Sequence, residues 1–185
     1  MTNLNEIAKQ MVAEGKGILA ADESSGTIKK RFDTINVNSS EENRMNYRRI
    51  LFESSEAMEN YISGVILFDE TIRQSNNDGE RLVDIIKKSG SLPGIKVDMG
   101  AKTLATMHDE TVTEGLDGLR ERLQEYSELG AKFAKWRAVI SISEKNPSAL
   151  CINVNAHALA RYAALCQESD IVPIVEPEVL SLIHI

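Results

Sequence analysis

Short apolar runs recur along this chain at intervals of roughly thirty to forty-five residues, and amphipathic stretches separate them. Each run is rich in β-branched residues and indicates a buried strand. The five runs are residues 17–21, 62–68, 95–97, 133–140 and 171–175. Their alternation with longer stretches predicts β-α units in a parallel sheet. Five such units fit either a complete doubly wound sheet or the first part of a (β/α)8 barrel, which needs about 250 residues.

The stretches between the runs predict helices from their caps and apolar spacing. One long helix is expected through Tyr47, Leu51 and Met58. A second is expected over residues 113–130, where an apolar stripe ends at a glycine. Ser148 should begin a third, alanine-rich helix.

Charged residues stand at the ends of four of the five runs, at alternating positions. They are Asp22, Lys96 with Asp98, Lys135 with Arg137, and Glu176 with Glu178. A period of two places each pair on one face of its strand. In a doubly wound sheet helices cover both faces, so these charges would be buried at high cost. In a barrel, one face points into the lumen, whose C-terminal mouth is where barrel enzymes have their active sites.

Any one of these pairs could simply be a strand end that reaches solvent. Three pairs and Asp22 at equivalent positions of four runs make that reading much weaker and favour the barrel. The charged groups would then converge on a small volume and alter one another's protonation, which is how acid–base sites are made.

A second signal follows the first run directly. The segment Glu23-Ser24-Ser25-Gly26-Thr27 leads into a predicted helix that contains Lys30 and Arg31. Free backbone N–H groups at a helix start, with hydroxyls and a cation one turn further on, can hold a phosphate. The same segment is also an ordinary helix cap, so both interpretations stay open.

Composition narrows the possible functions. The chain has 21 basic and 28 acidic residues and a net charge of −7, so its surface should repel nucleic acid and anionic lipid. No apolar run approaches the ~20 residues of a membrane helix, and we expect neither a nucleic-acid nor a membrane partner. The three histidines share no metal-ligand spacing and no glycine-rich nucleotide motif follows a strand, so no metal or other cofactor is expected.

The two cysteines, Cys151 and Cys166, fall in one predicted helix. At about 1.5 Å of rise per residue they lie roughly 22 Å apart, beyond the reach of a disulfide. We interpret them as reduced core thiols, which are typical of a cytoplasmic protein.

Five segments of the chain, taken in order, resemble the strand motifs of one known family. They are Gly15-Lys16-Gly17-Ile18-Leu19-Ala20-Ala21-Asp22-Glu23-Ser24, Gly64-Val65-Ile66-Leu67-Phe68, Gly94-Ile95-Lys96-Val97-Asp98, Phe133-Ala134-Lys135-Trp136-Arg137 and Val172-Pro173-Ile174-Val175-Glu176-Pro177-Glu178. The family is the class I (Schiff-base) fructose-1,6-bisphosphate aldolases, and the sequences of these segments are most similar to those of bacterial members. The resemblance covers about residues 4–180.

This resemblance implies the α/β class and a partial (β/α)8 TIM barrel. Residues 1–180 would form the first five βα units of a single aldolase domain, with strands six to eight missing. It also implies reversible cleavage of fructose 1,6-bisphosphate to dihydroxyacetone phosphate and glyceraldehyde 3-phosphate, a step of glycolysis and gluconeogenesis. The family uses no metal, because a strand-six lysine forms an imine with the substrate ketone and the imine draws electrons from the breaking bond.

The resemblance implies a role for each matching residue. Among the catalytic residues, Asp22 would take the proton of the substrate C4 hydroxyl, and Glu176 would be the acid–base of carbinolamine formation and dehydration. Lys135 would hold developing charge near the reacting hydroxyls. The remaining residues would bind substrate oxygens (Lys96 and Arg137), contact a phosphate (Ser24, Thr27 and Arg31) or position the imine lysine (Glu178).

The chain departs from the family after Glu178. Residues 181–185 replace the expected continuation, resemble nothing in the family and are expected to be an artefact. We therefore expect the imine lysine to lie beyond this chain's end and the isolated chain to be inactive. The full-length protein is a possible homo-oligomer. A smaller departure is Thr103-Leu104-Ala105-Thr106, where the family often has Pro-Leu-Ala-Gly.

Two alternatives remain beside this interpretation. One is a short protein that binds a sugar phosphate or a partner without catalysis, which predicts a stop codon after Ile185. The other is a different imine-forming aldolase on the same barrel, which the five strand motifs disfavour.

Overall fold

The computed structural model describes residues 4–107 and 109–180, so the predicted non-family segment 181–185 lies outside the described residues. The elements are α1 (Leu4–Met11), β1 (Gly17–Ala21), α2 (Ser25–Asp33), α3 (Glu41–Phe52), α4 (Ser55–Tyr61), β2 (Ile62–Leu67), α5 (Asp69–Arg73), α6 (Leu82–Lys88), β3 (Leu92–Lys96), β4 (Ala101–Thr103), β5 (Thr111–Thr113), α7 (Leu119–Leu129), β6 (Phe133–Ser141), α8 (Ala149–Glu168) and β7 (Val172–Leu180).

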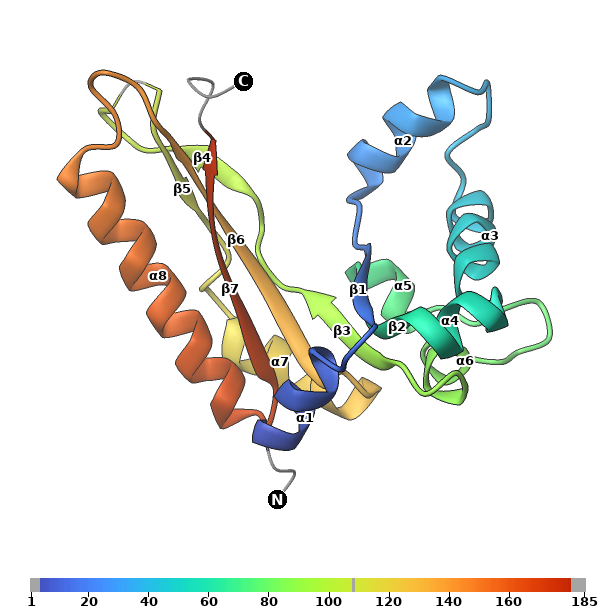
Figure 1. The fold of residues 1–185 in the computed structure, drawn as a ribbon. Helices are drawn as coiled ribbons and strands as arrows, with labels where there is room; N and C mark the ends of the chain where they lie inside the picture. The colour runs from blue at the N-terminus through green and yellow to red at the C-terminus, as the bar shows by residue number, and fades with distance from the viewer. Residues whose placement is uncertain (1–3, 108, 181–185) are drawn as a thin grey trace.

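Five strands form one parallel sheet in the order β1-β2-β3-β6-β7, and β4 pairs with β5 in a separate antiparallel hairpin. The sheet curls into part of a barrel (Figure 1). The predicted α/β class and the five parallel strands are confirmed.

The outer face of the sheet packs against helices. Alternate residues of the central strands, among them Val65, Ile95 and Trp136, are fully buried in one apolar cluster. Helices α6, α7 and α8 supply Leu82, Val83, Ile86, Leu119, Leu123, Leu159 and Tyr162 to it. Each such side chain stabilises the fold by about 1.5–3 kcal/mol on burial. In a doubly wound sheet, helices would cover the inner face in the same way as the outer face. In this protein the inner face is not covered in that way.

The inner face has its own apolar cluster, which we call the floor: Ile7, Met11, Ile66 and Phe133. Helix α1 supplies its first two members and lies at the N-terminal end of the strands (Figure 1). The Phe133 ring fits because Gly64 and Gly94 carry no side chain. A Cβ at Gly64 would lie 2.8 Å from the ring, and one at Gly94 would overlap it further.

Residues 113–118 differ from the sequence prediction. Thr113 ends strand β5 instead of opening a helix, and α7 begins only at Leu119, after Gly118 at φ 63°. Thr113 turns away from helical geometry because its hydroxyl donates to the carbonyl of Arg137 in β6, at 2.7 Å. The hairpin β4–β5 is thereby attached to the end of β6.

The long helix expected through residues 47–58 is two helices, α3 and α4. The break falls at Glu53 and Ser54. The Ser54 hydroxyl donates to the carbonyl of Ile50 at 2.8 Å, a local bond that competes with the helical ladder. The prediction of one long helix was wrong because the spacing of apolar residues gives no information about such a hydrogen bond.

Both cysteines lie in α8, as predicted, and both are buried free thiols. Burial raises the pKa of the Cys166 thiol to about 12, so it packs as a protonated, apolar group. Within residues 4–107 and 109–180 no helix is long and apolar enough to cross a membrane, and no three His, Cys, Asp or Glu side chains are grouped to hold a metal ion.

Candidate active site

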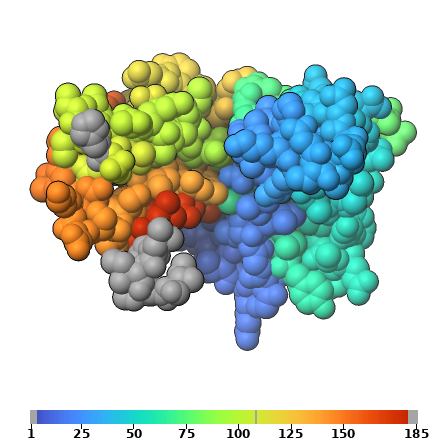
Figure 2. Space-filling view, turned by 90° about the horizontal axis from the view of Figure 1, so that it is seen from above, coloured from blue at the N-terminus to red at the C-terminus, as the bar shows by residue number. Residues whose placement is uncertain are grey.

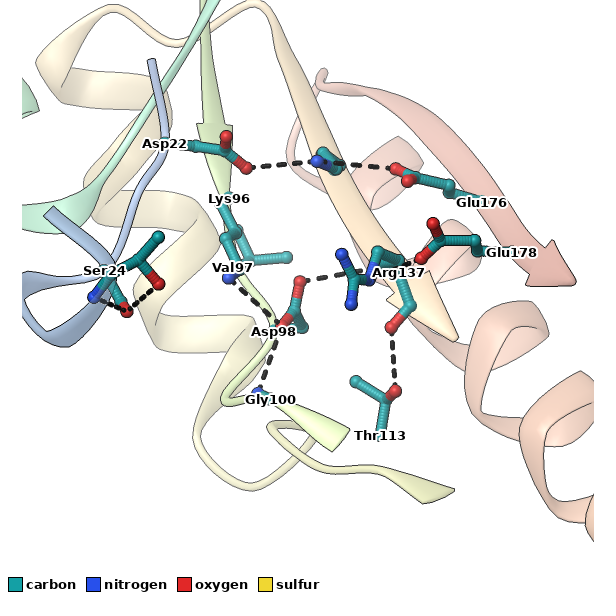
Figure 3. Close-up of polar contacts among 12 residues, drawn as sticks. Asp22, Ser24, Lys96, Val97, Asp98, Gly100, Thr113, Arg137, Glu176 and Glu178 are labelled. Atoms are coloured by element: carbon teal, nitrogen blue, oxygen red, sulfur yellow. Dashed lines mark hydrogen bonds and ion pairs between the residues drawn. The ribbon is translucent and has the colours of Figure 1, made fainter. Parts of the chain in front are cut away.

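The side chain of Lys135 lies between two carboxylates at the C-terminal rim of the sheet. Its Nζ is 3.1 Å from Asp22 Oδ2 and 3.6 Å from Glu176 Oε2. Three different strands supply these groups, because Asp22 follows β1 while Lys135 and Glu176 stand in β6 and β7. Figure 3 shows Asp22 and Glu176 pointing toward each other across the rim. Lys135 and Asp22 are only 14% and 13% exposed, so their attraction is less screened than in bulk water.

Arg137 lies two residues beyond Lys135, on the same face of β6. Its Nε is 3.0 Å from Glu178 Oε2. Its backbone is held on both sides, since its N–H donates to Asp98 Oδ2 at 3.5 Å and its carbonyl accepts from the Thr113 hydroxyl (Figure 3). The guanidinium is 48% exposed, so a fixed backbone presents a cation that a ligand can reach.

Lys96 and Asp98 reach the same rim from the end of β3. Asp98 is almost fully buried and accepts the N–H of Gly100 at 3.1 Å. Gly100 has φ 91°, a turn conformation that favours glycine. Lys96 Nζ is 3.8 Å from Asp98 Oδ1. The end of β3 therefore places Lys96 at the rim, and the turn that follows it holds the carboxylate of Asp98.

The loop after β1 carries the hydroxyls and the cation that the sequence singled out. Ser24 caps α2, because its Oγ accepts the N–H of Thr27 at 3.3 Å. Arg31, on the same helix, forms an ion pair with Glu23 and donates to the Tyr47 hydroxyl at 3.4 Å. The Glu23 charge, followed by the Tyr47 hydroxyl, raises the pKa of Arg31. The segment is therefore a helix cap that also presents a permanent cation.

One cavity of about 310 Å³ joins these groups. Seven of the nine predicted site residues line it: Asp22, Ser24, Thr27, Arg31, Lys96, Lys135 and Arg137. The other two, Glu176 and Glu178, reach its edge through their ion pairs with Lys135 and Arg137. Seen from above, the orange β6 and the red end of β7 lie beside the blue segment of β1 and α2 (Figure 2). The structure thus brings all nine residues to one rim, and their chemical roles stay predictions.

Sequence reasoning assigned no role to three further residues that shape the cavity. Asp98 was singled out by its alternation with Lys96, but neither the spacing nor the resemblance gave it a role. Glu23 lines the cavity, and only its place in the loop hinted at this. Arg48 of α3 gave no local signal: it is fully buried and its Nη2 donates to the Glu23 carbonyl at 2.7 Å.

The family model described as "Fructose-bisphosphate aldolase class-I" matches residues 3–182 of the chain. A probable fructose-bisphosphate aldolase class 1 of Xanthomonas campestris pv. campestris is 59% identical over 177 residues, which are 96% of this chain and 53% of that protein. Fructose-bisphosphate aldolase 1 of Toxoplasma gondii is 56% identical over 180 residues, covering 96% and 49%. The predicted likeness to bacterial members is confirmed.

A solved structure of fructose-bisphosphate aldolase from Plasmodium falciparum, in complex with TRAP and a small-molecule inhibitor, superposes with a TM-score of 0.92. Its sequence is 48% identical, and the match covers 96% of this chain and 51% of that one. The curled five-stranded sheet therefore corresponds to part of the aldolase barrel. The chain spans about half the length of the curated relatives it matches.

Proposed function

The chain belongs to the class I fructose-bisphosphate aldolase family, and on that premise we propose that its charged rim is part of the active site of a fructose 1,6-bisphosphate aldolase. The reaction is reversible cleavage to dihydroxyacetone phosphate and glyceraldehyde 3-phosphate, a step of glycolysis and gluconeogenesis. The observation that carries the proposal is the place of Lys135 between Asp22 and Glu176, with one group from each of three strands.

In this proposal the imine lysine belongs to a segment outside residues 1–185. Its amine condenses with the substrate ketone and releases water. When the bond between C3 and C4 breaks, its electron pair moves into the cationic imine and gives a neutral enamine. The C4 oxygen loses its proton at the same time and becomes the carbonyl oxygen of the released aldehyde.

The residues of this chain supply the proton transfers. The Asp22 carboxylate accepts the C4 hydroxyl proton. The Lys135 ammonium, 3.1 Å from Asp22, stabilises the negative charge that develops on that oxygen. Glu176 lies on the other side of Lys135 and exchanges the protons needed to form and dehydrate the carbinolamine. Asp22 and Glu176, held on two sides of Lys135, can therefore carry out different proton transfers in one catalytic cycle.

The outer part of the cavity binds the two ends of the substrate. Lys96 and Arg137 contact its hydroxyl or phosphate oxygens, because both are cations whose heads reach the cavity. Ser24, Thr27 and Arg31 form a second contact for a phosphate at the other side. Glu178 holds the Arg137 guanidinium at 3.0 Å, and in this proposal it also helps to position the imine lysine. Charge-assisted hydrogen bonds of this kind give both affinity and orientation.

We also propose a cytoplasmic location and a homo-oligomeric state for the full-length protein. The location is supported by the two buried free thiols and by a relative from Arabidopsis thaliana whose name is fructose-bisphosphate aldolase 4, cytosolic. Sedimentation of the full-length protein tests the oligomeric state, and a monomer at micromolar concentration would contradict it.

The function is tested by trapping the imine. The coding sequence downstream of codon 180 is read first, and we expect there a strand with an apolar–Lys–Pro pattern. Residues 1–185 and the extended protein are then incubated with fructose 1,6-bisphosphate and borohydride. Mass spectrometry should find a reduced adduct on the extended protein and none on residues 1–185.

Each other outcome has a definite meaning. An adduct on residues 1–185 would contradict the placement of the imine lysine. An extended protein that binds the sugar bisphosphate but forms no adduct and cleaves nothing would contradict the aldolase function. That result would favour a non-catalytic sugar-phosphate-binding protein.

A further inference from the structure

We propose that Glu23 is an internal anion that occupies Arg31 until a ligand phosphate displaces it. The inference rests on the proposed sugar-phosphate function of the cavity. It gives a part in ligand affinity to a carboxylate that the proposed reaction leaves unused.

The ion pair between Glu23 and Arg31 lies in the cavity wall, and both residues line the cavity beside Ser24 and Thr27. Their exposure differs sharply, because the side chain of Arg31 is 56% exposed and that of Glu23 only 9%. A ligand arriving from solvent therefore meets the guanidinium first, with the carboxylate held behind it. That guanidinium is already neutralised by a partner of the same charge sign as a phosphate.

A second cation lies next to Glu23. Arg48 is fully buried, and its Nη2 donates to the Glu23 carbonyl at 2.7 Å. Burial lowers the pKa of Arg48, and the nearby Glu23 charge opposes that lowering. Within the described part of the chain, Glu23 Oε2 and Arg48 Nε are both buried and lack a hydrogen-bond partner. The Nη1 of Arg48 lies 3.5 Å from Glu70 Oε1, and its Nε is thus the group that offers the Glu23 carboxylate an alternative partner when a phosphate takes Arg31.

Two anions then compete for one exposed guanidinium. While Glu23 keeps its place, its charge repels a phosphate, and displacing it breaks an ion pair. Both effects weaken phosphate binding at Arg31. Removing the Glu23 charge without shortening the side chain should therefore strengthen phosphate binding about three- to tenfold, a size set by one nearby charge in a partly screened site.

The test is a double-mutant cycle on residues 1–185, with inorganic phosphate as the probe and binding followed by calorimetry or ³¹P NMR. The variants are Glu23→Gln, Arg31→Met and the double substitution. We expect Glu23→Gln to bind phosphate about three- to tenfold more tightly than the wild type. Arg31→Met should bind it weakly, and Glu23→Gln should add nothing in that background.

The matched control is Asp33→Asn on the same helix. Asp33 pairs with Lys29 at 2.7 Å and does not line the cavity, so phosphate affinity should not change. The proposal is overturned if Glu23→Gln binds no more tightly than the wild type. It is also overturned if the gain persists in the Arg31→Met background, which would show a general effect of net charge.

A measurement on the wild type decides the question if Glu23→Gln fails to fold. With ¹³C-labelled glutamate, the carboxyl resonance of Glu23 should move on saturation with phosphate. That of Glu80, which pairs with Lys88 away from this cavity, should not. An unmoved Glu23 resonance overturns the proposal. Equal phosphate binding by the wild type and Arg31→Met would instead contradict the proposed phosphate contact, and no binding by any variant would contradict both.

Discussion

The floor and the rim lie on the same inner face of the same sheet, yet they have opposite chemistry. Along β6 the inward residues are Phe133, Lys135 and Arg137, so one strand passes from the floor to the rim in two steps. The pairing register shows the same change from floor to rim across neighbouring strands, because Gly94 of β3 pairs with Phe133 and Lys96 pairs with Lys135. The alternation of a strand therefore sets only the face of a residue.

The position of a residue along the strand decides whether it belongs to the floor or to the rim. The floor is closed by α1 and filled by one aromatic ring, so it tolerates neither charge nor extra volume. The rim opens to solvent and to the loops after the strands, so lysines and carboxylates can pair there while they remain within reach of a ligand. The floor should accordingly govern stability and the rim should govern binding.

The largest effect is expected at the floor, from Gly94→Ala. The new Cβ would overlap the Phe133 ring, so either the ring or two paired strands must move. The free energy of unfolding should fall by about 3 kcal/mol, at the upper end for overpacking. Urea denaturation measures it. Gly26→Ala in α2 is the control: its Cβ would have nothing within 4 Å and should not destabilise the chain. An equally stable Gly94→Ala variant would refute the packed floor.

At the rim, Lys135→Met should mainly weaken ligand binding, whereas Gly94→Ala at the floor mainly lowers stability. Asp22 and Glu176 would face each other without the cation between them, and the ligand would lose a charged contact. Affinity for fructose 1,6-bisphosphate should fall about 30- to 100-fold, which corresponds to about 2–3 kcal/mol for a hydrogen bond to a charged group. Calorimetry measures it. Lys132→Met, just before the same strand begins, should stay close to the wild type. Similar losses of affinity from both substitutions would contradict the distinction between floor and rim.

Thr113→Val tests whether the hairpin supports the rim. Thr113 is 3% exposed, and valine keeps its shape but leaves the Arg137 carbonyl without that donor. We expect a loss of about 1–2 kcal/mol in unfolding free energy and a few-fold weaker binding of fructose 1,6-bisphosphate. Thr113→Ser keeps the hydroxyl and should restore most of the binding. Valine and serine variants that bind alike would show that this hydrogen bond does not position Arg137.

The smallest effect is expected from Thr106→Gly in the hairpin loop. Thr106 has φ 68°, a left-handed conformation that is costly for a β-branched residue and free for glycine. The substitution should raise the unfolding free energy by about 0.5–1 kcal/mol without changing ligand affinity. Thermal unfolding measures it, with Thr103→Gly in β4 as a control that should destabilise. A less stable Thr106→Gly variant would contradict the strain.

The sequence predicted the sheet and the convergence of charges because both depend on alternation along single strands. Lys135 and Arg137 are two residues apart, and their shared face follows from local geometry alone. Ser148 likewise caps α8 as expected, through its hydroxyl and the N–H of Cys151. Signals within a few residues were thus sufficient for the strands, one cap and the rim.

The sequence could not predict what depends on contacts between distant segments. The hairpin was missed because its strands have three residues each and the Thr113 hydroxyl, which attaches it to β6, lies 24 residues from its acceptor. Arg48 was missed because nothing in a polar helix shows that one arginine turns inward to the loop after β1. The rim's supporting residues therefore needed the structure.

The most direct test of the central claim is an amide NMR titration of residues 1–185 with fructose 1,6-bisphosphate. We predict that the resonances that shift are those of the rim, around Asp22, Lys96, Lys135, Arg137 and Glu176 and at the start of α2. Those of α1 and of the floor residues Ile66 and Phe133 should stay in place. Shifts confined to the floor or to the helix-covered outer face, or none at saturating ligand, would contradict the account.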